Sequence, residues 1–399
     1  MMKSANVIII GAGPVGTFAA YCLAEYGIDT LVLESETTCE TDMRASTFHP
    51  STLKYLDNLD LANELIERGL KAPIFQYRIR STDEVLEFDL QELDDVLDFP
   101  FRLQCEQYKF ARMLAEKLDN HRHSSVLFNR KLIKFTEEVN KVRLDVDHHG
   151  VNEQYQCDYL IGADGANSIV RRNLGIEFSG FTYEEKFFTL STEKPLEDYF
   201  SNLSYVNYVS DPEEWFVLLK APSAWRILVP VPQSLDDDLI KSDDYVTEIF
   251  SRVLNSSDPI ETIHRTIYRV HQRVVNKMRS RRIILAGDSA HLNNPLGGFG
   301  MNGGLHDAWN LAEKLDAIIN HKKEMDLLDL YDRQRRTIMN DFIQKQTIRN
   351  KKMIEETGDE EYSSEWIRMR NLHENDNERR GYMLRQSMTQ SLINEAAIK

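Results

Sequence analysis

The N-terminal hydrophobic pattern predicts a strand, a turn, a helix and a second strand. Val7–Ile10 is an unbroken β-branched run, which is typical of a parallel strand buried on both faces. Gly11–Gly16 interrupts the apolar run, and helical spacing follows it as far as Gly27, a typical helix stop. Ile28–Leu33 is predicted to be the second strand, and Glu34 stands at its end.

The pattern up to residue 178 keeps alternating between strands and helices. Segments in which apolar residues recur at every second position, as in strands, alternate with segments in which they recur at helical spacing, and polar turns separate the segments. The expected elements are helices near Ser51–Leu56, Asp60–Arg68 and Gln107–Leu118, hairpins at Gln76–Arg80 with Val85–Asp89 and Leu132–Glu138 with Val142–Asp147, and a strand at Tyr159–Ala163. That strand ends at Asp164-Gly165, and Ser168 is the expected N-cap of a short helix.

Between about Gly180 and Tyr268 the segments become β-like and rich in aromatic residues, and one clear helix, about Tyr245–Val253, interrupts them. This change predicts an antiparallel sheet inserted into the α/β pattern. An inserted sheet of this kind is more often plain core, but it can also form one wall of a binding cleft.

The α/β pattern returns with a short apolar strand at Arg282–Leu285. Five glycines then crowd into Pro295–Gly304, ahead of a helix whose buried face is expected to carry Leu305, Ala308, Leu311, Ala312 and Leu315. Glycines let the backbone lie flat against a planar ligand. The helix N-terminus offers free N–H groups and positive potential to an anion.

The first glycine-rich turn fits the pattern G-x-G-x-x-G, and each of its glycines has a physical role in a nucleotide-binding turn. Gly11 allows a tight turn, Gly13 lets a pyrophosphate approach the backbone, and Gly16 lets helix and strand pack closely. Glu34 can accept hydrogen bonds from both hydroxyls of an adenosine ribose. With strand, helix, second strand and terminal acid all in place, the sequence predicts a dinucleotide site.

Composition narrows the class of protein. The chain has 399 residues, 42% hydrophobic and 28% charged, which fits a globular protein of two closely joined domains. The net charge of −16, with no basic stripe, argues against nucleic acid and anionic membrane as partners. Four scattered cysteines (Cys22, Cys39, Cys105 and Cys157) without C-x-x-C indicate reduced thiols and no metal site.

The apolar stretch Val7–Ala24 superficially resembles a signal peptide or a membrane span. Three glycines and a proline interrupt it, and the strand-turn-helix interpretation accounts for each of them. No other segment is apolar enough to cross a bilayer. We therefore expect a cytoplasmic protein.

Four blocks in a fixed order carry a resemblance to a known family. They are Gly11–Gly16 with Glu34, then Arg44, then Asp164-Gly165, then Gly287-Asp288 with its glycine-rich helix entry. Over about residues 5 to 320 this order resembles the single-component, FAD-dependent aromatic hydroxylases (class A flavoprotein monooxygenases), such as para-hydroxybenzoate hydroxylase. The stretch from Arg282 to Leu315 is the closest match.

The resemblance implies FAD contacts along the whole order of blocks. The pyrophosphate contacts it implies are Gly11, Gly13, Val15, Gly16, Asp164 and Gly165, and the ribose contact is Glu34. Arg44 and Gln107 are implied along the sugar-phosphate arm, although Gln107 by itself is expected to cap its helix. At the flavin end the implied contacts are Gly287, Asp288 on a ribityl hydroxyl, Pro295 beside the isoalloxazine, and backbone at Gly300, Met301 and Asn302.

The implied fold is α/β: a Rossmann-like FAD-binding domain (1–178 and 266–320) with an inserted antiparallel β-sheet substrate domain (179–265) and a helical C-terminal region (321–399). The hairpin of 72–102 is expected to contribute to the substrate domain. The C-terminal region has mixed charges and is expected to be a solvated, packed tail. A homodimer is compatible with it but has no support in the sequence.

The implied reaction uses NADPH or NADH and O2 to hydroxylate a small aromatic or heteroaromatic substrate through a flavin C4a-hydroperoxide. A single G-x-G-x-x-G indicates that NAD(P)H binds transiently. The alternatives are an FAD-dependent reductase or dehydrogenase, a non-catalytic nucleotide-binding module, and a halogenase, whose W-x-W-x-I-P signature Ala224–Pro230 does not match. The sequence names no catalytic base; His49, His291 and tyrosines of the inserted sheet are the candidates.

Overall fold

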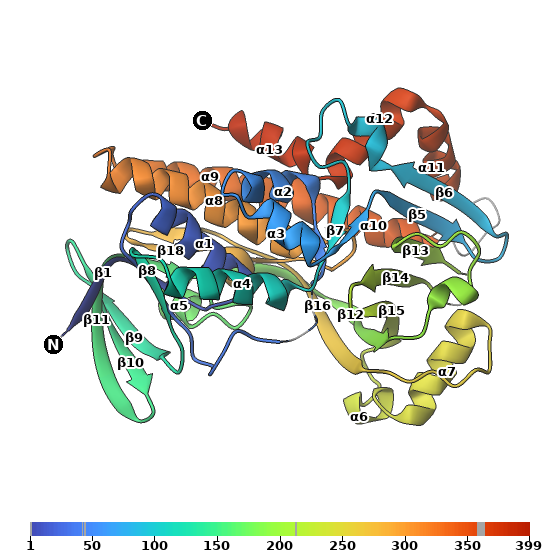
Figure 1. Ribbon diagram of the computed structural model, residues 1–399, viewed down its shortest axis with the longest axis horizontal. Coiled ribbons are helices and arrows are strands. Elements are labelled where there is room, and N and C mark those ends of the chain that lie inside the picture. The colour runs from blue at the N-terminus through green and yellow to red at the C-terminus, as the bar shows by residue number, and fades with distance from the viewer. Residues whose placement is uncertain (1, 42, 44, 212–213, 357–363) are drawn as a thin grey trace.

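The computed structural model describes residues 2–41, 43, 45–211, 214–356 and 364–399. Two large sheets organise these residues, and a small sheet joins them (Figure 1). The α/β fold predicted from the sequence is confirmed, with a parallel sheet near the N-terminus, an inserted sheet and a helical C-terminal region. The exact domain boundaries stay a prediction.

The first sheet has its parallel strands at the centre. Its order is β17 (Arg279–Ser280), β18 (Ile283–Leu285), β11 (Val151–Gly162), β1 (Lys3–Ile10), β2 (Thr30–Leu33) and β8 (Ser124–Leu127). β1 pairs parallel with both β2 and β11, and β18 pairs parallel with β11. β9 (Lys131–Glu137) and β10 (Val142–His148) continue antiparallel from β11.

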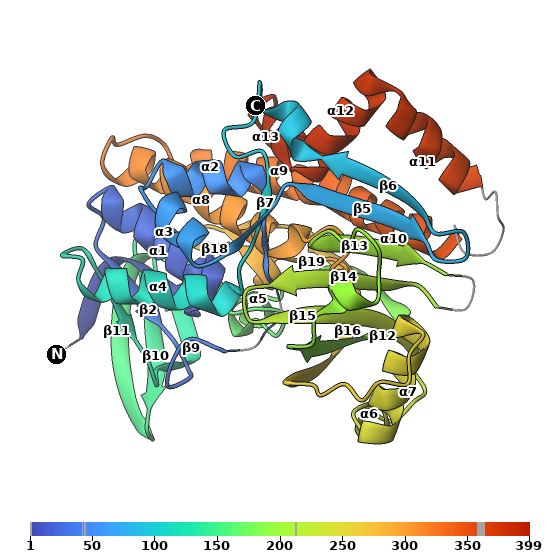
Figure 2. The same cartoon turned by 45° about the vertical axis from the view of Figure 1, so that its right-hand side comes forward.

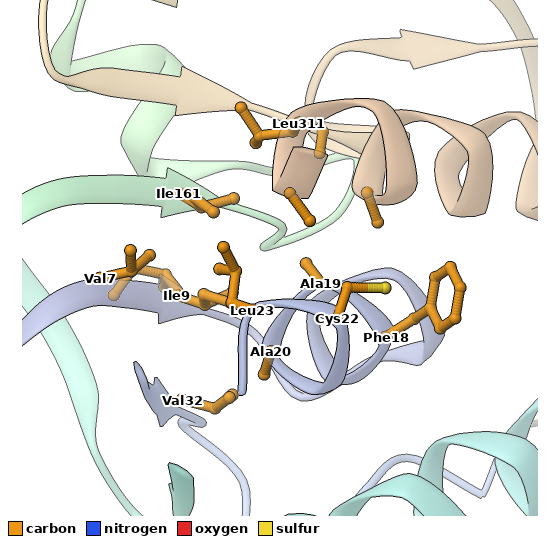
Figure 3. Close-up of a cluster of buried hydrophobic side chains, with 14 of the residues drawn as sticks. Val7, Ile9, Phe18, Ala19, Ala20, Cys22, Leu23, Val32, Ile161 and Leu311 are labelled. Atoms are coloured by element: carbon orange, nitrogen blue, oxygen red, sulfur yellow. The ribbon is translucent and has the colours of Figure 1, made fainter. Parts of the chain in front are cut away.

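The central strand is buried as its composition predicts. Val7, Ile8 and Ile9 are fully buried and Ile10 is 6% exposed. They share one hydrophobic cluster with residues of several helices and of the hairpin formed by β9 and β10, so β1 is buried on both faces. α1 (Pro14–Glu25) packs directly on it. Figure 3 shows this cluster, formed by Val7, Ile9, Phe18, Ala19, Leu23, Val32, Ile161 and Leu311 among others.

Helices from distant parts of the chain surround the first sheet. α8 (Phe299–Ile319) lies beside α1, and Leu305, Ala308, Leu311, Ala312 and Leu315 are buried on it, as the sequence predicts (Figure 1). The others are α2 (Pro50–Asp57), α3 (Ala62–Glu67), α4 (Gln107–Asp119) and α5 (Ile169–Asn173). The side chain of Ser168 accepts a hydrogen bond from Arg171 N, so the predicted N-cap of α5 is confirmed.

The second sheet contains the inserted strands and the early hairpin. Its order is β19 (His291–Leu292), β16 (His264–Val275), β12 (Phe178–Thr192), β15 (Ala224–Pro232), β14 (Phe216–Ala221), β13 (Val206–Ser210), β5 (Ile74–Ile79) and β6 (Glu84–Asp89). All neighbours are antiparallel except β13 and β5. The small sheet of β3 (Thr47–Phe48), β7 (Arg102–Gln104) and β4 (Leu70–Ala72) connects the two.

Different helices cover the two faces of the second sheet (Figure 2). α6 (Asp237–Ile240) and α7 (Asp243–Leu254) pack on one face, so a short helix precedes the single helix expected from the sequence. C-terminal helices cover the other face. That region contains α9 (Leu327–Ile338), a π-helical turn (Met339–Gln344), α10 (Lys345–Glu356), α11 (Ser364–Glu374), α12 (Asp376–Gln386) and α13 (Thr389–Ala396).

The C-terminal region is part of the core rather than only a solvated tail. Trp366, Met369 and Met383 are almost fully buried against the face formed by β5 and β6. Trp366 also donates from its indole nitrogen to Glu84 Oε2 over 2.9 Å. Among the helices that the structure describes, none combines the length and the apolar character needed to cross a bilayer.

Replacing Trp366 with alanine should lower the free energy of unfolding by about 3–5 kcal/mol, because the change empties a large buried site and leaves Glu84 with one donor fewer. Urea denaturation followed by circular dichroism measures the loss. Ile367→Ala is the matched control, since the neighbouring Ile367 is 41% exposed. Equal, small effects of the two changes would contradict the packing described for α11.

Candidate cofactor and substrate site

The predicted ligand-binding residues meet at one edge of the first sheet. β2, β1, β11 and β18 lie side by side and run in the same direction, so their carboxyl ends share this edge. Glu34, Gly11, Asp164 and Gly287 follow these strands in that spatial order. Ligands of open parallel sheets bind in the crevice at such an edge.

Two glycines of the first turn are required by contacts within the protein. Gly11 has φ +104°, and a methyl group there would lie 2.5 Å from the carbonyl oxygen of Ala163. At Gly16 a methyl group would lie 2.0 Å from the carbonyl oxygen of Gly11. These contacts bring the start of α1 against the ends of β1 and β11.

Gly13 differs, because a methyl group there would meet no described atom of the protein within 4 Å. Gly13 is the N-cap of α1, and no side chain caps this helix. The first N–H groups of α1 are therefore left for another partner. The space and the free donors together fit an anionic group such as a pyrophosphate.

Glu34 is bound to the same turn. Its Oε2 accepts from Ala12 N over 2.7 Å, and its Oε1 accepts from Glu36 N over 3.0 Å. The carboxylate is therefore held in a fixed position beside the turn. A carboxylate oxygen has room for a second donor, so these bonds leave capacity for ribose hydroxyls.

Asp164 presents one used and one unused oxygen. Oδ2 accepts from Ile169 N (2.7 Å) and Val170 N (3.1 Å) at the start of α5. Oδ1 is buried and has no hydrogen-bond partner within the described ranges. Burial raises the pKa of this carboxyl despite its hydrogen bonds. Gly165 follows with φ +74°, a conformation that favours glycine.

The side chain of Val15, in the first turn of α1, packs between the turn at Gly287 and the helix α8. A methyl group at Gly287 would lie 3.0 Å from a methyl of Val15, and one at Gly304 would lie 2.5 Å from it. Gly287 also has φ +66°. The two turns and α8 therefore touch at Val15, so its side chain has a packing role.

The N-terminus of α8 has no side-chain cap. Gly298, its N-cap, has φ +72°, and no side chain caps the helix. The backbone N–H groups of Phe299, Gly300 and Met301 consequently have no acceptor within the helix. Their donors and the helix dipole favour negative charge at this point.

The side chain of Asn302 uses its full hydrogen-bonding capacity within the protein. Oδ1 accepts from His49 N (2.9 Å) and Thr52 Oγ1 (2.7 Å). Nδ2 donates to the carbonyl oxygens of Thr47 (2.8 Å) and Gly298 (2.7 Å). Asn302 thus clamps the 47–52 segment to the first turn of α8, and only its backbone is left for a ligand.

A cluster of buried charged side chains holds the turn at Gly287 against α8. Asp307 of α8 accepts from Gly287 N (2.9 Å) and contacts His291 Nε2 (2.6 Å) through Oδ2. Its Oδ1 accepts from Arg335 Nε over 2.6 Å, and Arg335 also pairs with Glu395 of α13. Burial alone would raise the pKa of Asp307, but His291 and Arg335 lower it to about 2.

Each of the two histidines considered as catalytic bases has its Nε2 in a structural contact, while its Nδ1 is buried without a hydrogen-bond partner among the described residues. His49 is fully buried, stacks on Phe299 at 5.2 Å, and places Nε2 2.8 Å from the carbonyl oxygen of Gly297, to which it donates. Burial, and next the nearby charge of Arg102, hold the pKa of His49 well below its usual value. His291 is paired with Asp307. Neither contact supports a catalytic role.

The remaining predicted residues have different outcomes. Arg44 lies outside the described residues. Asp288 and Pro295 are both exposed, Asp288 in the turn after β18 and Pro295 in the loop between β19 and α8. The capping role expected for Gln107 is wrong: Glu106 occupies the N-cap of α4, and no side chain caps that helix.

Sequence reasoning missed several buried polar residues that belong to the strands of the second sheet. The hydroxyls of Thr189 and Ser191 are buried without partners in the described parts of the chain. Arg226 of the adjacent strand binds the carbonyl oxygen of Met43 and Ser46 Oγ. Tyr77 and Tyr208 stack at 5.0 Å, and Tyr77 Oη lies 2.8 Å from Tyr382 Oη of α12.

The architecture combines a parallel sheet, whose carboxyl edge has the glycine turns typical of dinucleotide-binding domains, with a second, largely antiparallel sheet. The sequence profile of the FAD-binding domain family matches residues 4–346. The chain belongs to this family, that of the FAD-dependent aromatic hydroxylases.

Individual relatives agree with this assignment. The chain is 31% identical over 341 residues to a 6-hydroxy-3-succinoylpyridine 3-monooxygenase of Pseudomonas putida, covering 84% of this chain and 85% of that one. It is 30% identical over 342 residues to a para-nitrophenol 4-monooxygenase of a Pseudomonas species, covering 84% of each. The crystal structure of a p-nitrophenol 4-monooxygenase from Pseudomonas putida matches with a TM-score of 0.88 at 27% identity, over 99% of this chain and 98% of that one.

Replacing Asn302 with alanine should lower the free energy of unfolding by roughly 3 kcal/mol or more, because four buried backbone and hydroxyl groups lose their partner. Thermal or urea denaturation measures the effect. Asn293→Ala is a fitting control, since the Asn293 amide donates one hydrogen bond to the neighbouring Asn294 carbonyl (2.7 Å). A loss no larger than that of the control would argue against the clamp.

Proposed function

We propose that the chain binds FAD along the edge of the first sheet and uses it, with NAD(P)H and O2, to hydroxylate a small phenol-like aromatic or heteroaromatic compound. The observation that carries the proposal is the meeting of Gly11, Glu34, Asp164 and Gly287 at one sheet edge, beside the open N-terminus of α8.

The residues proposed to hold FAD fall into groups along the carboxyl edge of the first sheet, and each group would contact a different part of the cofactor. The N-terminus of α1, with Gly11, Gly13 and Gly16, would hold the pyrophosphate, and Glu34 the adenosine ribose. Asp164 would accept a hydrogen bond through its unused Oδ1. The proposed contacts at the flavin end and along the connecting arm are Val15, Arg44, Gln107, Gly165, Gly287, Asp288, Pro295, Gly300, Met301 and Asn302.

Bound FAD supplies the redox chemistry, the transfer of electrons from NAD(P)H to O2 and of one oxygen atom to the substrate ring. The protein would position the reactants and supply charge. Free N–H groups at the start of α8 are suited to stabilise negative charge on the reduced flavin ring. The buried aromatic wall of the second sheet and α12 would keep water away from the substrate.

The named relatives guide the choice of substrates. One of them acts on para-nitrophenol and another on 6-hydroxy-3-succinoylpyridine. We propose the same broad class here, a six-membered aromatic ring carrying a hydroxyl group. A cytoplasmic location and transient binding of NAD(P)H are part of the same proposal.

Oxygen labelling tests this function. The FAD-loaded protein is given NADH or NADPH, 18O2, and a panel of hydroxylated benzenes and pyridines, and products are analysed by mass spectrometry. We expect stimulated NAD(P)H oxidation and a product that carries one labelled oxygen atom. Turnover that converts substrate without incorporating the label would instead support the reductase or dehydrogenase.

Alanine at Gly13 and at Gly16 should separate cofactor binding from folding. At Gly13 the methyl group meets no protein atom within 4 Å, so stability should change by about 1 kcal/mol or less while FAD affinity falls ~10-fold or more. At Gly16 the clash with Gly11 should cost ~2 kcal/mol or more without any ligand. Denaturation of the apoprotein and FAD titration measure both effects; unchanged FAD affinity in Gly13→Ala would contradict the proposed pyrophosphate site.

A further inference from the structure

A triad of buried charges joins the last helix of the chain to the turn at Gly287. Arg335 of α9 lies between Asp307 of α8 and Glu395 of α13, and the three side chains are at most 9% exposed. Arg335 donates from Nε to Asp307 Oδ1 over 2.6 Å and from Nη1 to Glu395 Oε2. Asp307 accepts from Gly287 N over 2.9 Å with its other oxygen. The triad therefore ends at the turn that is proposed to contact the flavin part of FAD.

The carboxylate of Glu395 is held in place from both sides. Its Oε1 accepts from Asn310 Nδ2 of α8. Just beyond it, Gln334 of α9 donates to the carbonyl oxygen of Ile398 over 3.0 Å. The family profile ends at residue 346, so Glu395 lies outside the segment that assigns the chain to its family. A residue of the C-terminal region thus belongs to the support of the proposed cofactor site.

Hydrogen bonding within the triad does not require a charge on Glu395. Asp307 and Arg335 already form a neutral pair, and burial of a further carboxylate is unfavourable. An amide oxygen has two lone pairs, so a glutamine could accept from both Arg335 and Asn310. Lys314, the neighbouring cation, donates to Asn310 Oδ1 over 2.6 Å and to a second amide oxygen over 2.8 Å, and pairs with no carboxylate in the described ranges. The charge of Glu395 therefore needs an explanation beyond packing.

Such a charge acts on the redox equilibrium of a flavin bound at this end of the site. When the flavin ring accepts a hydride from NAD(P)H, the ring gains one negative charge and NAD(P)H becomes NAD(P)+. The N-terminus of α8 favours that gain, whereas a buried negative charge behind the turn opposes it. Charges in the interior are screened much less than charges in water, so a carboxylate need not touch the ring to have an effect.

We propose that Glu395, acting through Arg335 and Asp307, lowers the reduction potential of bound FAD. Glu395 is a positioning residue, since it holds a negative charge behind the turn at Gly287 without contacting the cofactor. The reduced flavin is thereby a stronger electron donor toward O2. The inference rests on the proposed FAD site and assigns to it a residue near the C-terminus.

The midpoint potential of bound FAD tests the proposal. The FAD-loaded protein is reduced anaerobically in equilibrium with a reference dye, in the absence of any aromatic substrate. Glu395→Gln keeps the shape of the side chain and removes its charge. The potential should rise by an amount that corresponds to ~10-fold stronger binding of reduced relative to oxidised flavin, about 30 mV for a two-electron couple.

Two further variants separate charge from architecture. Glu395→Asp keeps the charge but shortens the side chain, so the potential should stay near that of the unmodified protein even where stability falls. Glu84→Gln is the matched control, because Glu84 pairs with Arg370 of α11 over 2.7 Å and ties another C-terminal helix to the second sheet. This control should leave the potential unchanged.

Asp307→Asn gives an independent measurement if Glu395→Gln does not fold. It removes a negative charge that lies directly at the turn, so it should raise the potential by more than Glu395→Gln does. No rise in either variant would contradict the proposal. Equal shifts in Glu395→Asp and Glu395→Gln would also contradict it, because they would assign the triad to architecture alone.

The outcome is distinguishable from that of the oxygen-labelling experiment. A potential that rises in Glu395→Gln, together with no labelled product from the unmodified protein, would remove the hydroxylase function and keep the role of Glu395. Labelled product together with an unchanged potential would do the opposite.

Discussion

The close approach of backbone to backbone at the first glycine turn is the constraint on which the site depends. Gly16 lies against the carbonyl oxygen of Gly11, and Gly11 lies against that of Ala163. No larger residue fits at either position without moving a strand or a helix. This contact places the open end of α1 over the carboxyl ends of β1 and β11, where Glu34, Asp164 and Gly287 also converge.

A second set of contacts fixes the other end of the site. Asn302 ties the 47–52 segment to α8 with three hydrogen bonds and makes a fourth to the N-cap residue of α8. Asp307 ties α8 to Gly287 and, through Arg335, to Glu395 near the C-terminus. Removing one member of a buried ion cluster leaves an uncompensated charge. The C-terminal helices are therefore connected to the proposed flavin end by buried charges as well as by apolar packing.

Much of the fold could be predicted because its signals are local. The β-branched run Val7–Ile10 and the glycine turn after it predict a buried strand and a nucleotide-binding helix, and the structure has both. The role of the C-terminal helices could not be predicted in the same way. Their mixed charges predict a solvated, packed tail but not the elements it packs against. Trp366 and Tyr382 are buried by contacts with β5 and β6, nearly three hundred residues earlier in the chain.

The substrate side of the site shows the same limit. Arg102 and Gln104 belong to a three-residue strand with no motif, and only the tertiary arrangement shows that their donors are buried and unsatisfied.

The central claim, that distant glycine turns enclose one flavin, is tested most directly by titrating flavin-free protein with FAD and following the quenching of flavin fluorescence. Tight binding that saturates at one FAD per chain is the predicted result. A protein that folds but takes up no FAD would contradict the claim.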